Sequence, residues 1–250
     1  MIEPAALVAY CDQLLDAPRF ADYAPNGLQV EGERPVRRLI SGVTACAALI
    51  AAACEAQADA ILVHHGWFWK HENPCLTGIK GFRARRLLNA GISLIAYHLP
   101  LDAHSEMGNN VTLGRQLGFM EMEPTTLANG LVWVGRLSTS VLPEAFAEQV
   151  SRQLDRRVTL VGERREPVTR IAWCTGGGQG YLQSAAALGI DAFISGELSE
   201  QTAHEARELG ICYLAAGHHA TERYGVQALG AHLAERFDLQ QTFIEIDNPA

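Results

Sequence analysis

The strongest constraint on the fold is an alternation of strands and helices that occurs twice along the 250-residue chain. Three strand-like apolar runs occur in each half: residues 38–44, 60–63 and 92–97, and then residues 170–175, 191–195 and 211–216. The segments between them have apolar residues at helical spacing. Steady alternation of this kind predicts parallel strands covered by helices.

Small motifs also correspond between the two halves. Three pairs of positions match when the second half is placed against the first: Thr44 with Thr175, Asp59 with Asp191, and His98 with His218. The chain therefore resembles a diverged duplication. We expect an α/β protein made of two similar α/β/α layered domains.

The domain boundary is predicted near residue 125. A turn signal at Asn129-Gly130 is followed by a strand and by a helix that opens at Pro143. We expect the tail, with a helix over 224–237 and a strand over 242–246, to pack back on the first half. The predicted domains are residues 1–125 with 224–250, and residues 126–223.

Charge and hydropathy exclude several classes of partner. The formal net charge of −8 disfavours nucleic acid and anionic membranes as main partners, because both repel a negative surface. No apolar run reaches the roughly 18 residues that span a bilayer, and the start lacks the positive flank of a signal peptide. We expect a cytoplasmic protein whose six scattered cysteines are reduced and structural.

Histidines stand at the ends of the predicted strands. His64 and His65 follow one strand, and His98 and His218 follow the last strand of each half. In parallel sheets, ligands gather beyond these carboxyl ends. Each histidine alone has a simpler explanation, as a polar residue at a strand end or on the surface. Taken with carboxylates four residues after His98 and His218, they predict a metal site with these ligands: His64, His65, Asp102, His218 and Glu222.

Two metal ions suit this set better than one. Neighbouring strand residues point to opposite faces, so His64 and His65 share an ion only if the chain turns sharply at Gly66. Five donors also exceed the needs of one tetrahedral ion, whereas two ions can share a carboxylate. Mixed nitrogen and oxygen ligands accept Zn, Mn, Fe, Co or Ni. Pro100 disfavours helical backbone at Leu99, so we expect a bend there before any helix begins.

The predicted chemistry is hydrolysis of an anionic small molecule. Two divalent ions outweigh the two carboxylates, so the site should attract anions, above all phosphate esters. A bound divalent ion lowers the pKa of water to about 7, so no serine or cysteine nucleophile is needed. Three further residues are candidates for a catalytic role: His98, His104 and Glu197. His104 and Glu197 either transfer protons or support the ligands, and the alternative for each is a purely structural role.

Two motifs near these residues have alternative interpretations. Trp67 and Trp69 follow the histidine pair and either form an aromatic rim that stacks a base or ring, or belong to the core or to a subunit contact. The run Gly176 to Gly178 either cradles a phosphate or forms a tight turn between a strand and a helix. The turn is favoured, because no lysine follows in the P-loop pattern.

Several segments together resemble the GTP cyclohydrolase 1 type 2 family, also called NGG1-interacting-factor-3-like proteins. They span most of the chain: residues 22–30, 63–70, 98–104, 108–110, 196–201 and 217–222. The resemblance implies a two-domain α/β protomer in a toroidal homohexamer. It also implies a two-metal centre in each subunit with the same five ligands. Longer members carry an inserted domain, for which this chain is too short.

Two functions follow from the residues and the resemblance. The first is a metal-dependent hydrolase of a nucleotide or another phosphorylated small molecule, related to GTP cyclohydrolase 1 type 2. The resemblance further implies a role in handling damaged nucleotides, and hence in DNA damage. The alternative is a non-catalytic hexamer that binds metal or a protein partner.

Overall fold

The computed structural model describes residues 1–250 and contains two separate β-sheets. The chain forms two compact units: the first unit is Met1–Leu101 with Gly225–Asp247, and the second is Asp102–Tyr224 with Asn248–Ala250. This grouping places residues 102–125 in the second unit. The domain boundaries drawn from the sequence stay a prediction.

The first unit contains a five-stranded sheet in the order β1-β4-β3-β2-β11. Its strands are β1 (Gly27–Val30), β2 (Arg38–Thr44), β3 (Ala60–His65), β4 (Ser93–Ala96) and β11 (Gln240–Phe243). Only β1 runs antiparallel to its neighbour, and β11 lies parallel to β2. The tail therefore pairs with the first-half sheet, as the sequence predicts.

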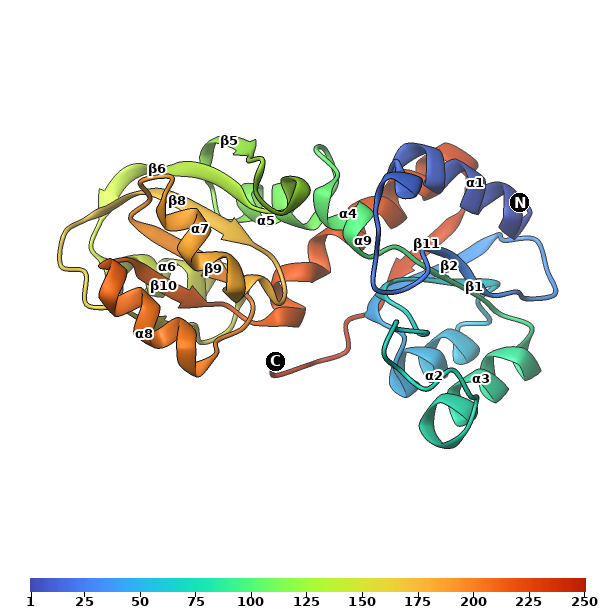
Figure 1. Cartoon of the computed structure of the whole chain (residues 1–250). Helices are drawn as coiled ribbons and strands as arrows, with labels where there is room; N and C mark the ends of the chain where they lie inside the picture. Colours follow the sequence, from blue (N-terminus) through green and yellow to red (C-terminus); the bar gives the residue numbers. More distant parts are fainter. The chain divides into compact units, whose positions relative to one another are not determined.

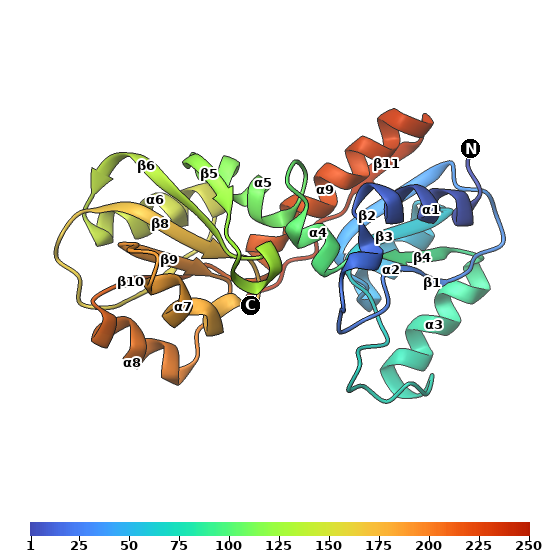
Figure 2. The ribbon, with the colours of Figure 1, turned by 45° about the horizontal axis from the view of Figure 1, so that its top comes forward.

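Helices cover both faces of this sheet, as Figures 1 and 2 show. On one face lie α2 (Ala47–Glu55) and α3 (Gly78–Ala90). On the other lie α1 (Pro4–Leu14) and the later part of α9 (His218–Phe237). Gly91 ends α3 with φ 63°, a left-handed conformation that suits glycine.

The second unit contains a six-stranded sheet in the order β5-β6-β8-β9-β10-β7. Its strands are β5 (Met120–Pro124), β6 (Trp133–Val141), β7 (Thr159–Val161), β8 (Val168–Cys174), β9 (Ala192–Ser195) and β10 (Cys212–Ala215). The central strands β8, β9 and β10 are parallel, like β2, β3 and β4 in the first unit. The remaining pairings of this sheet are antiparallel.

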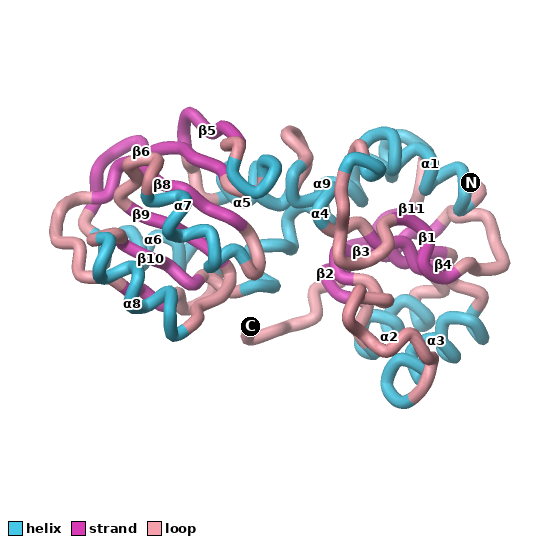
Figure 3. The backbone as a smooth tube through the Cα atoms, viewed as in Figure 1, coloured by secondary structure: helices cyan, strands magenta, loops and turns pink.

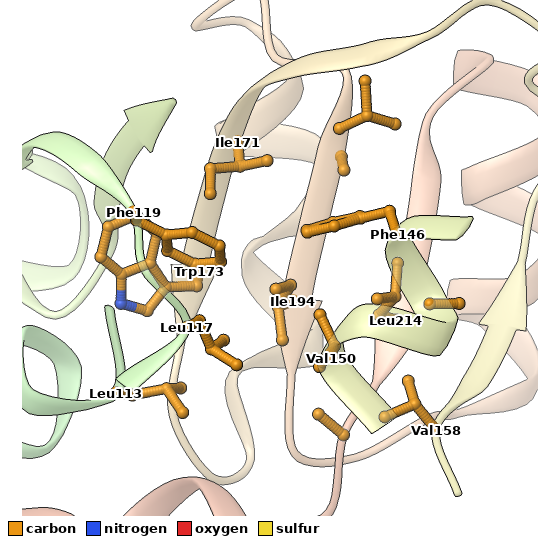
Figure 4. Packing of buried hydrophobic residues seen from close by; sticks show 14 of the residues in the cluster. Leu113, Leu117, Phe119, Phe146, Val150, Val158, Ile171, Trp173, Ile194 and Leu214 are labelled. Carbon is orange, nitrogen blue, oxygen red and sulfur yellow. The ribbon is translucent and has the colours of Figure 1, made fainter. Parts of the chain in front are cut away.

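Residues of the central strands alternate between two apolar layers, one on each face of this sheet. Trp173 and Ile194 join the layer that contains α5 (Asn109–Gln116) and α6 (Pro143–Leu154), shown in Figure 4. Phe193 and Tyr213 join the opposite layer, with α7 (Leu182–Ala186) and α8 (Glu200–Leu209). In each unit, strands lie between helices, as Figure 3 shows. The α/β layered fold is therefore confirmed.

Short helices complete the chain: η1 (Ala17–Arg19), α4 (Leu99–Ala103), η2 (Leu127–Gly130) and η3 (Gly178–Tyr181). The prediction of a bend at Leu99 before any helix is wrong, because α4 begins at that residue. Pro100 lies in the first turn of α4, where a helix needs no N–H donor from it.

None of the helices is both long and apolar enough to cross a membrane. All six cysteines are free, and three of them are buried: Cys11, Cys174 and Cys212. Burial raises the pKa of the Cys11 thiol to about 12.

In each half, an aspartate at the matching position accepts hydrogen bonds from the backbone at the start of a central strand. Asp59, which precedes β3, accepts hydrogen bonds from two consecutive backbone N–H groups at the start of β2, at 3.0 and 2.8 Å. Asp191, which precedes β9, does the same at the start of β8, at 2.9 and 2.8 Å. This shared device explains why the two aspartates match in the sequence.

We predict that Asp191→Ala destabilises the protein by about 1–3 kcal/mol, because two backbone N–H groups lose their acceptor. Asp191→Asn should cost less, since the amide oxygen still accepts. Chemical unfolding followed by circular dichroism measures both effects. Glu208→Ala, at an exposed position of α8, is the control. Equal stability of Asp191→Ala and this control would contradict the prediction.

Candidate metal centre

Three imidazoles cluster in the first unit at the carboxyl ends of β3 and β4. His64 is fully buried, and His65 and His98 are half-buried. The ring centroids are 4.5 Å apart for His64 and His65, 5.1 Å for His64 and His98, and 5.7 Å for His65 and His98. One ring nitrogen of each lies within 4.8 Å of the other two. His64 and His65 therefore converge, although alternation along a strand predicts opposite directions.

Hydrogen bonds at Nδ1 orient the two histidines of β3. The Nδ1 of His64 lies 2.9 Å from the carbonyl oxygen of Tyr97. Because a carbonyl oxygen only accepts, this nitrogen carries the proton and Nε2 holds the lone pair of the neutral ring. The Nδ1 of His65 lies 3.3 Å from Oγ1 of Thr44, the residue paired with it on β2.

His98 is held by the loop that precedes β1. Its Nδ1 lies 2.7 Å from Oδ1 of Asp22, and its backbone N–H donates to Oδ1 of Asn26 at 2.8 Å. Burial alone would raise the pKa of Asp22, but hydrogen bonds and the charge of His98 lower it to about 2. Asp22 is therefore ionised at neutral pH. Neither Asp22 nor Asn26 has a role predicted from the sequence, where both fall in the segment 22–30 that contributes to the family resemblance.

The two tryptophans have different environments. Trp67 is buried in the apolar core, and its indole N–H donates to the carbonyl of Ala45 at 3.0 Å. Trp69 is half-buried and lies edge-on to His98, with ring centroids 5.0 Å apart, and 5.9 Å from His65. Only Trp69 therefore packs against the imidazoles.

In the second unit, two buried carboxylates lie close together. Asp102 is 6% exposed and Glu222 is 3% exposed, and one oxygen of each lies within 4.8 Å of the other. Like charges at this distance repel strongly where water is excluded. A cation beside the pair would reduce this repulsion. Oxygen ligands with a nearby imidazole suit a divalent metal ion.

A buried polar network fixes Asp102. Its Oδ1 accepts a hydrogen bond from Nδ2 of Asn109 at 2.8 Å and lies 3.4 Å from the Thr175 hydroxyl. Asn110 donates from Nδ2 to the carbonyl of Asp102 at 3.2 Å and accepts from the backbone N–H of Thr175 at 3.1 Å. Both asparagines are fully buried. The sequence marks them only as part of a motif, because hydrogen bonds between distant segments leave no local pattern.

His218, the first residue of α9, lies between two carboxylates of the second unit. Its Nδ1 is 2.7 Å from Oε1 of Glu197, and its Nε2 is 3.1 Å from Oε2 of Glu222. Burial would lower the pKa of His218, but hydrogen bonds and charges of Glu222 and Glu197 raise it to about 9. A metal ion at Nε2 must therefore displace a proton. The structure thus brings Glu197 against His218, and the roles predicted for Glu197 stay predictions.

Glycine permits the close packing around Glu222. The glycine run forms the tight turn from β8 into η3, and Gly176 has φ 61°. A Cβ at Gly176 would overlap Oε1 of Glu222. The carbonyl of Gly176 accepts from the N–H of Gly196 at 2.8 Å, and the carbonyl of Gly196 accepts from Gly217 at 2.9 Å. These bonds join the loops that follow β8, β9 and β10.

His104 has a structural role near the start of α5. Its Nδ1 accepts from the backbone N–H groups of Glu106 and Met107, both at 3.2 Å. The neutral ring therefore carries its proton on Nε2. A catalytic role for His104 stays a prediction.

Comparisons with known proteins agree with this fold. A family model described as Duf34/NIF3 (NGG1p interacting factor 3) matches residues 3–249. A protein of Allochromatium vinosum named GTP cyclohydrolase 1 type 2 homolog is 70% identical over 250 residues, covering 100% of this chain and 98% of that protein. A Pseudomonas aeruginosa protein of the same name is 56% identical over 248 residues, with 98% of each covered.

Two solved structures match the whole chain. The protein ybgI, described as of unknown function, has a TM-score of 0.95 and 46% identity, with 100% of both chains covered. TTHA1606 from Thermus thermophilus has a TM-score of 0.90 and 34% identity, also with 100% of both chains covered. The fold is therefore shared with close relatives along its full length.

We predict that Gly176→Ala lowers affinity for a divalent ion by about tenfold or more, because the new Cβ displaces the Glu222 carboxylate. Gly189→Ala is the matched control: Gly189 has φ 70° and no atom within 4 Å of an added Cβ. Both substitutions place alanine in left-handed backbone, but only the first meets a carboxylate. Competition with a chromophoric chelator measures the affinities, and equal values would contradict the prediction.

Proposed function

Because the chain belongs to the Duf34/NIF3 family, we propose that it is a dinuclear metal-dependent hydrolase of a nucleotide or another phosphorylated small molecule. The observation that carries this proposal is the buried carboxylate pair of Asp102 and Glu222. Protonated His218 offsets one of these two negative charges, and bound divalent ions would offset both. A hydrolase of anions uses such cations for both binding and chemistry.

The proposed ligands of the two ions are those of the sequence analysis: His64, His65, Asp102, His218 and Glu222. Each unit contributes donors that its own fold already gathers, imidazoles in the first and carboxylates with His218 in the second. His98 and Asp102 stand only four residues apart along the chain, on either side of the boundary between the two units. Zn, Mn, Fe, Co and Ni all suit this mixture of nitrogen and oxygen.

The chemistry divides between the ions and the protein. When bound, divalent ions lower the pKa of water to about 7 and polarise a phosphoryl oxygen. Glu197 holds Nδ1 of His218, so that Nε2 is the nitrogen directed toward Glu222. Asn109 fixes the Asp102 carboxylate through Oδ1. We assign proton transfer at Nε2 to His104, a half-buried histidine that presents a protonated Nε2 in its neutral form.

The substrate class follows from charge. The two divalent ions together carry more positive charge than Asp102 and Glu222 neutralise, so the centre attracts phosphate groups. Relatives are named GTP cyclohydrolase 1 type 2 homolog, which favours a purine nucleotide or a damaged form of one. Trp69 supplies a flat aromatic wall beside the imidazoles. A role in the response to DNA damage would follow from such a substrate.

We place the protein in the cytoplasm as a toroidal homohexamer. The family resemblance supports the assembly, and the formal net charge of −8 is consistent with a protein that avoids nucleic acid and anionic membranes. Light scattering after size-exclusion chromatography measures the mass. A monomer or dimer at micromolar concentration would contradict the hexamer.

We predict that removing the metal with a chelator abolishes hydrolysis of a nucleotide panel, and that adding divalent ions restores it. The double variant His64→Ala with Glu222→Ala should stay inactive under both conditions, because it lacks ligands in each unit. His204→Ala, at an exposed position of α8, is the control and should behave like the original chain. Turnover is measured by product chromatography.

Other outcomes of these experiments distinguish a metal-dependent hydrolase from a non-catalytic binding protein. Unchanged turnover by the double variant would contradict a metal-dependent hydrolase. A metal-loaded hexamer that is inert on phosphoesters, cyclic amides and nucleotides, yet retains one cellular protein in pull-downs, would instead support the non-catalytic binding protein.

A further inference from the structure

Residues Asn248–Ala250, which we call the 248–250 segment, pack with the second unit. Arg156 donates from one terminal nitrogen to the backbone oxygen of Pro249 at 3.1 Å and from the other to that of Ala250 at 3.2 Å. The backbone N–H of His219 donates to the same oxygen of Ala250 at 3.2 Å. Three donors therefore converge on two oxygens of this segment.

The fold of the second unit fixes Arg156 in this position. Asp155 ends α6 in left-handed backbone with φ 52°, and the N–H of the next residue, Arg156, donates to the carbonyl of Ser151 at 3.1 Å. The guanidinium lies against Gly217, where an added Cβ would overlap it. Only glycine therefore leaves room for the guanidinium at the residue directly before His218.

The guanidinium of Arg156 is better suited to an anion than to its present partners. Both terminal nitrogens bond backbone oxygens, and the buried Nε makes no hydrogen bond within the chain. Pro249 offers a neutral carbonyl, whereas a phosphate offers charged oxygens that the fork of an arginine binds in pairs. A phosphate group would therefore satisfy the same donors and add the attraction between opposite charges.

The Arg156 cradle, formed by the Arg156 guanidinium and the N–H of His219, adjoins the candidate centre of the second unit. His218 stands between Gly217 and His219 in the chain, and its Nε2 lies 3.1 Å from Oε2 of Glu222. The substrate proposed above is phosphorylated. An anchor for its phosphate group beside a proposed metal ligand fits that substrate.

We propose that the Arg156 cradle binds a phosphate group of the nucleotide substrate, and that the 248–250 segment is an autoinhibitory occupant that the substrate displaces. Because the segment is attached to the chain, it competes at an effective concentration on the order of 1 mM. Displacement is therefore expected at millimolar phosphate. This inference rests on the proposed function for the identity of the substrate, and phosphate binding tests it without turnover.

The main test compares the phosphate affinity of metal-stripped variants by isothermal titration calorimetry at constant ionic strength. The metal is removed because divalent ions would also bind the probe. Deletion of residues 248–250 should raise the affinity for inorganic phosphate about tenfold, because the competing oxygens are gone. In the shortened chain, Arg156→Gln should lower the affinity about tenfold. Arg156→Lys should fall between, because lysine keeps the charge but loses the fork.

Arg157→Gln in the shortened chain is the matched control. It removes the same charge from the next, exposed residue and should change the affinity less than twofold. Circular dichroism shows whether each variant is folded. Equal affinities of the full-length and shortened chains would overturn the proposal, and so would equal affinities of the shortened chain with and without Arg156→Gln.

Displacement of the segment can also be measured in the full-length chain, which decides if Arg156→Gln fails to fold. With alanine methyl groups labelled for NMR, the signal of Ala250 is identified by its loss in Ala250→Gly. Saturating inorganic phosphate should narrow this signal as the segment is released, and chloride at the same ionic strength should not. A signal that saturating phosphate leaves unchanged would overturn the proposal.

The source of the phosphate group is tested with GMP, inorganic phosphate and guanosine. Release of the segment by GMP at a lower concentration than by inorganic phosphate would support a nucleotide in the cradle. Tighter binding of inorganic phosphate than of GMP would overturn the assignment to a nucleotide. Release by guanosine, which carries no phosphate, at the same concentration as by GMP would overturn phosphate recognition.

These outcomes are distinguishable from those that test the proposed function. Release of the segment by phosphate in a chain that hydrolyses nothing would support the cradle and contradict the hydrolase. A hydrolase whose KM is unchanged both by deletion of residues 248–250 and by Arg156→Gln would contradict the cradle and leave the hydrolase supported.

Discussion

Repulsion between the buried carboxylates of Asp102 and Glu222 is the interaction on which the second unit's chemistry depends. Their oxygens lie within 4.8 Å of each other, and both side chains are more than nine-tenths buried. Protonated His218 offsets part of this charge, and without it or another cation the pair would be strongly unfavourable in a low-dielectric interior. The protein nevertheless fixes it firmly, with Asn109 donating to Asp102 and glycine at position 176 leaving room for Glu222. Such rigidity is useful when the compensating charge arrives as a bound ion.

Parallel strands explain why the polar residues gather at single edges of the sheets. Register pairs Thr44 with His65 in the first unit and Cys174 with Ser195 in the second, so the chain leaves neighbouring strands at the same level. Side chains just beyond these ends are brought together whatever their distance in the sequence. Burial of the apolar strands stabilises each unit. The polar side chains of the candidate site lie at the strand ends and in the segments that follow them.

The sequence predicts the layers and the position of the histidines at strand ends, because both depend on local patterns, whereas their role as metal donors stays a prediction. Apolar periodicity identifies the strands, and Gly91 and Gly210 mark the ends of α3 and α8 with left-handed backbone. Hydrogen bonds between distant segments have no such pattern, which is why the roles of Asp22 and Asn109 emerge only from the structure. The bend expected at Pro100 failed for a different reason: proline disfavours helix interiors but not first turns, and α4 is little more than one turn.

Duplication followed by divergence accounts for the different chemistry of the two units. Position 65 is histidine in the first repeat, whereas its counterpart, position 197, is a glutamate that hydrogen-bonds His218. The first repeat therefore has an imidazole where the second has a carboxylate, and the carboxylate that contacts His98, that of Asp22, comes from the loop before β1. Because neutral imidazoles do not repel one another as carboxylates do, the first unit can gather three of them at little electrostatic cost. In the proposed metal centre the buried carboxylates belong to the second unit and the cluster of imidazoles to the first, so the two copies of one sheet edge have come to carry different polar residues.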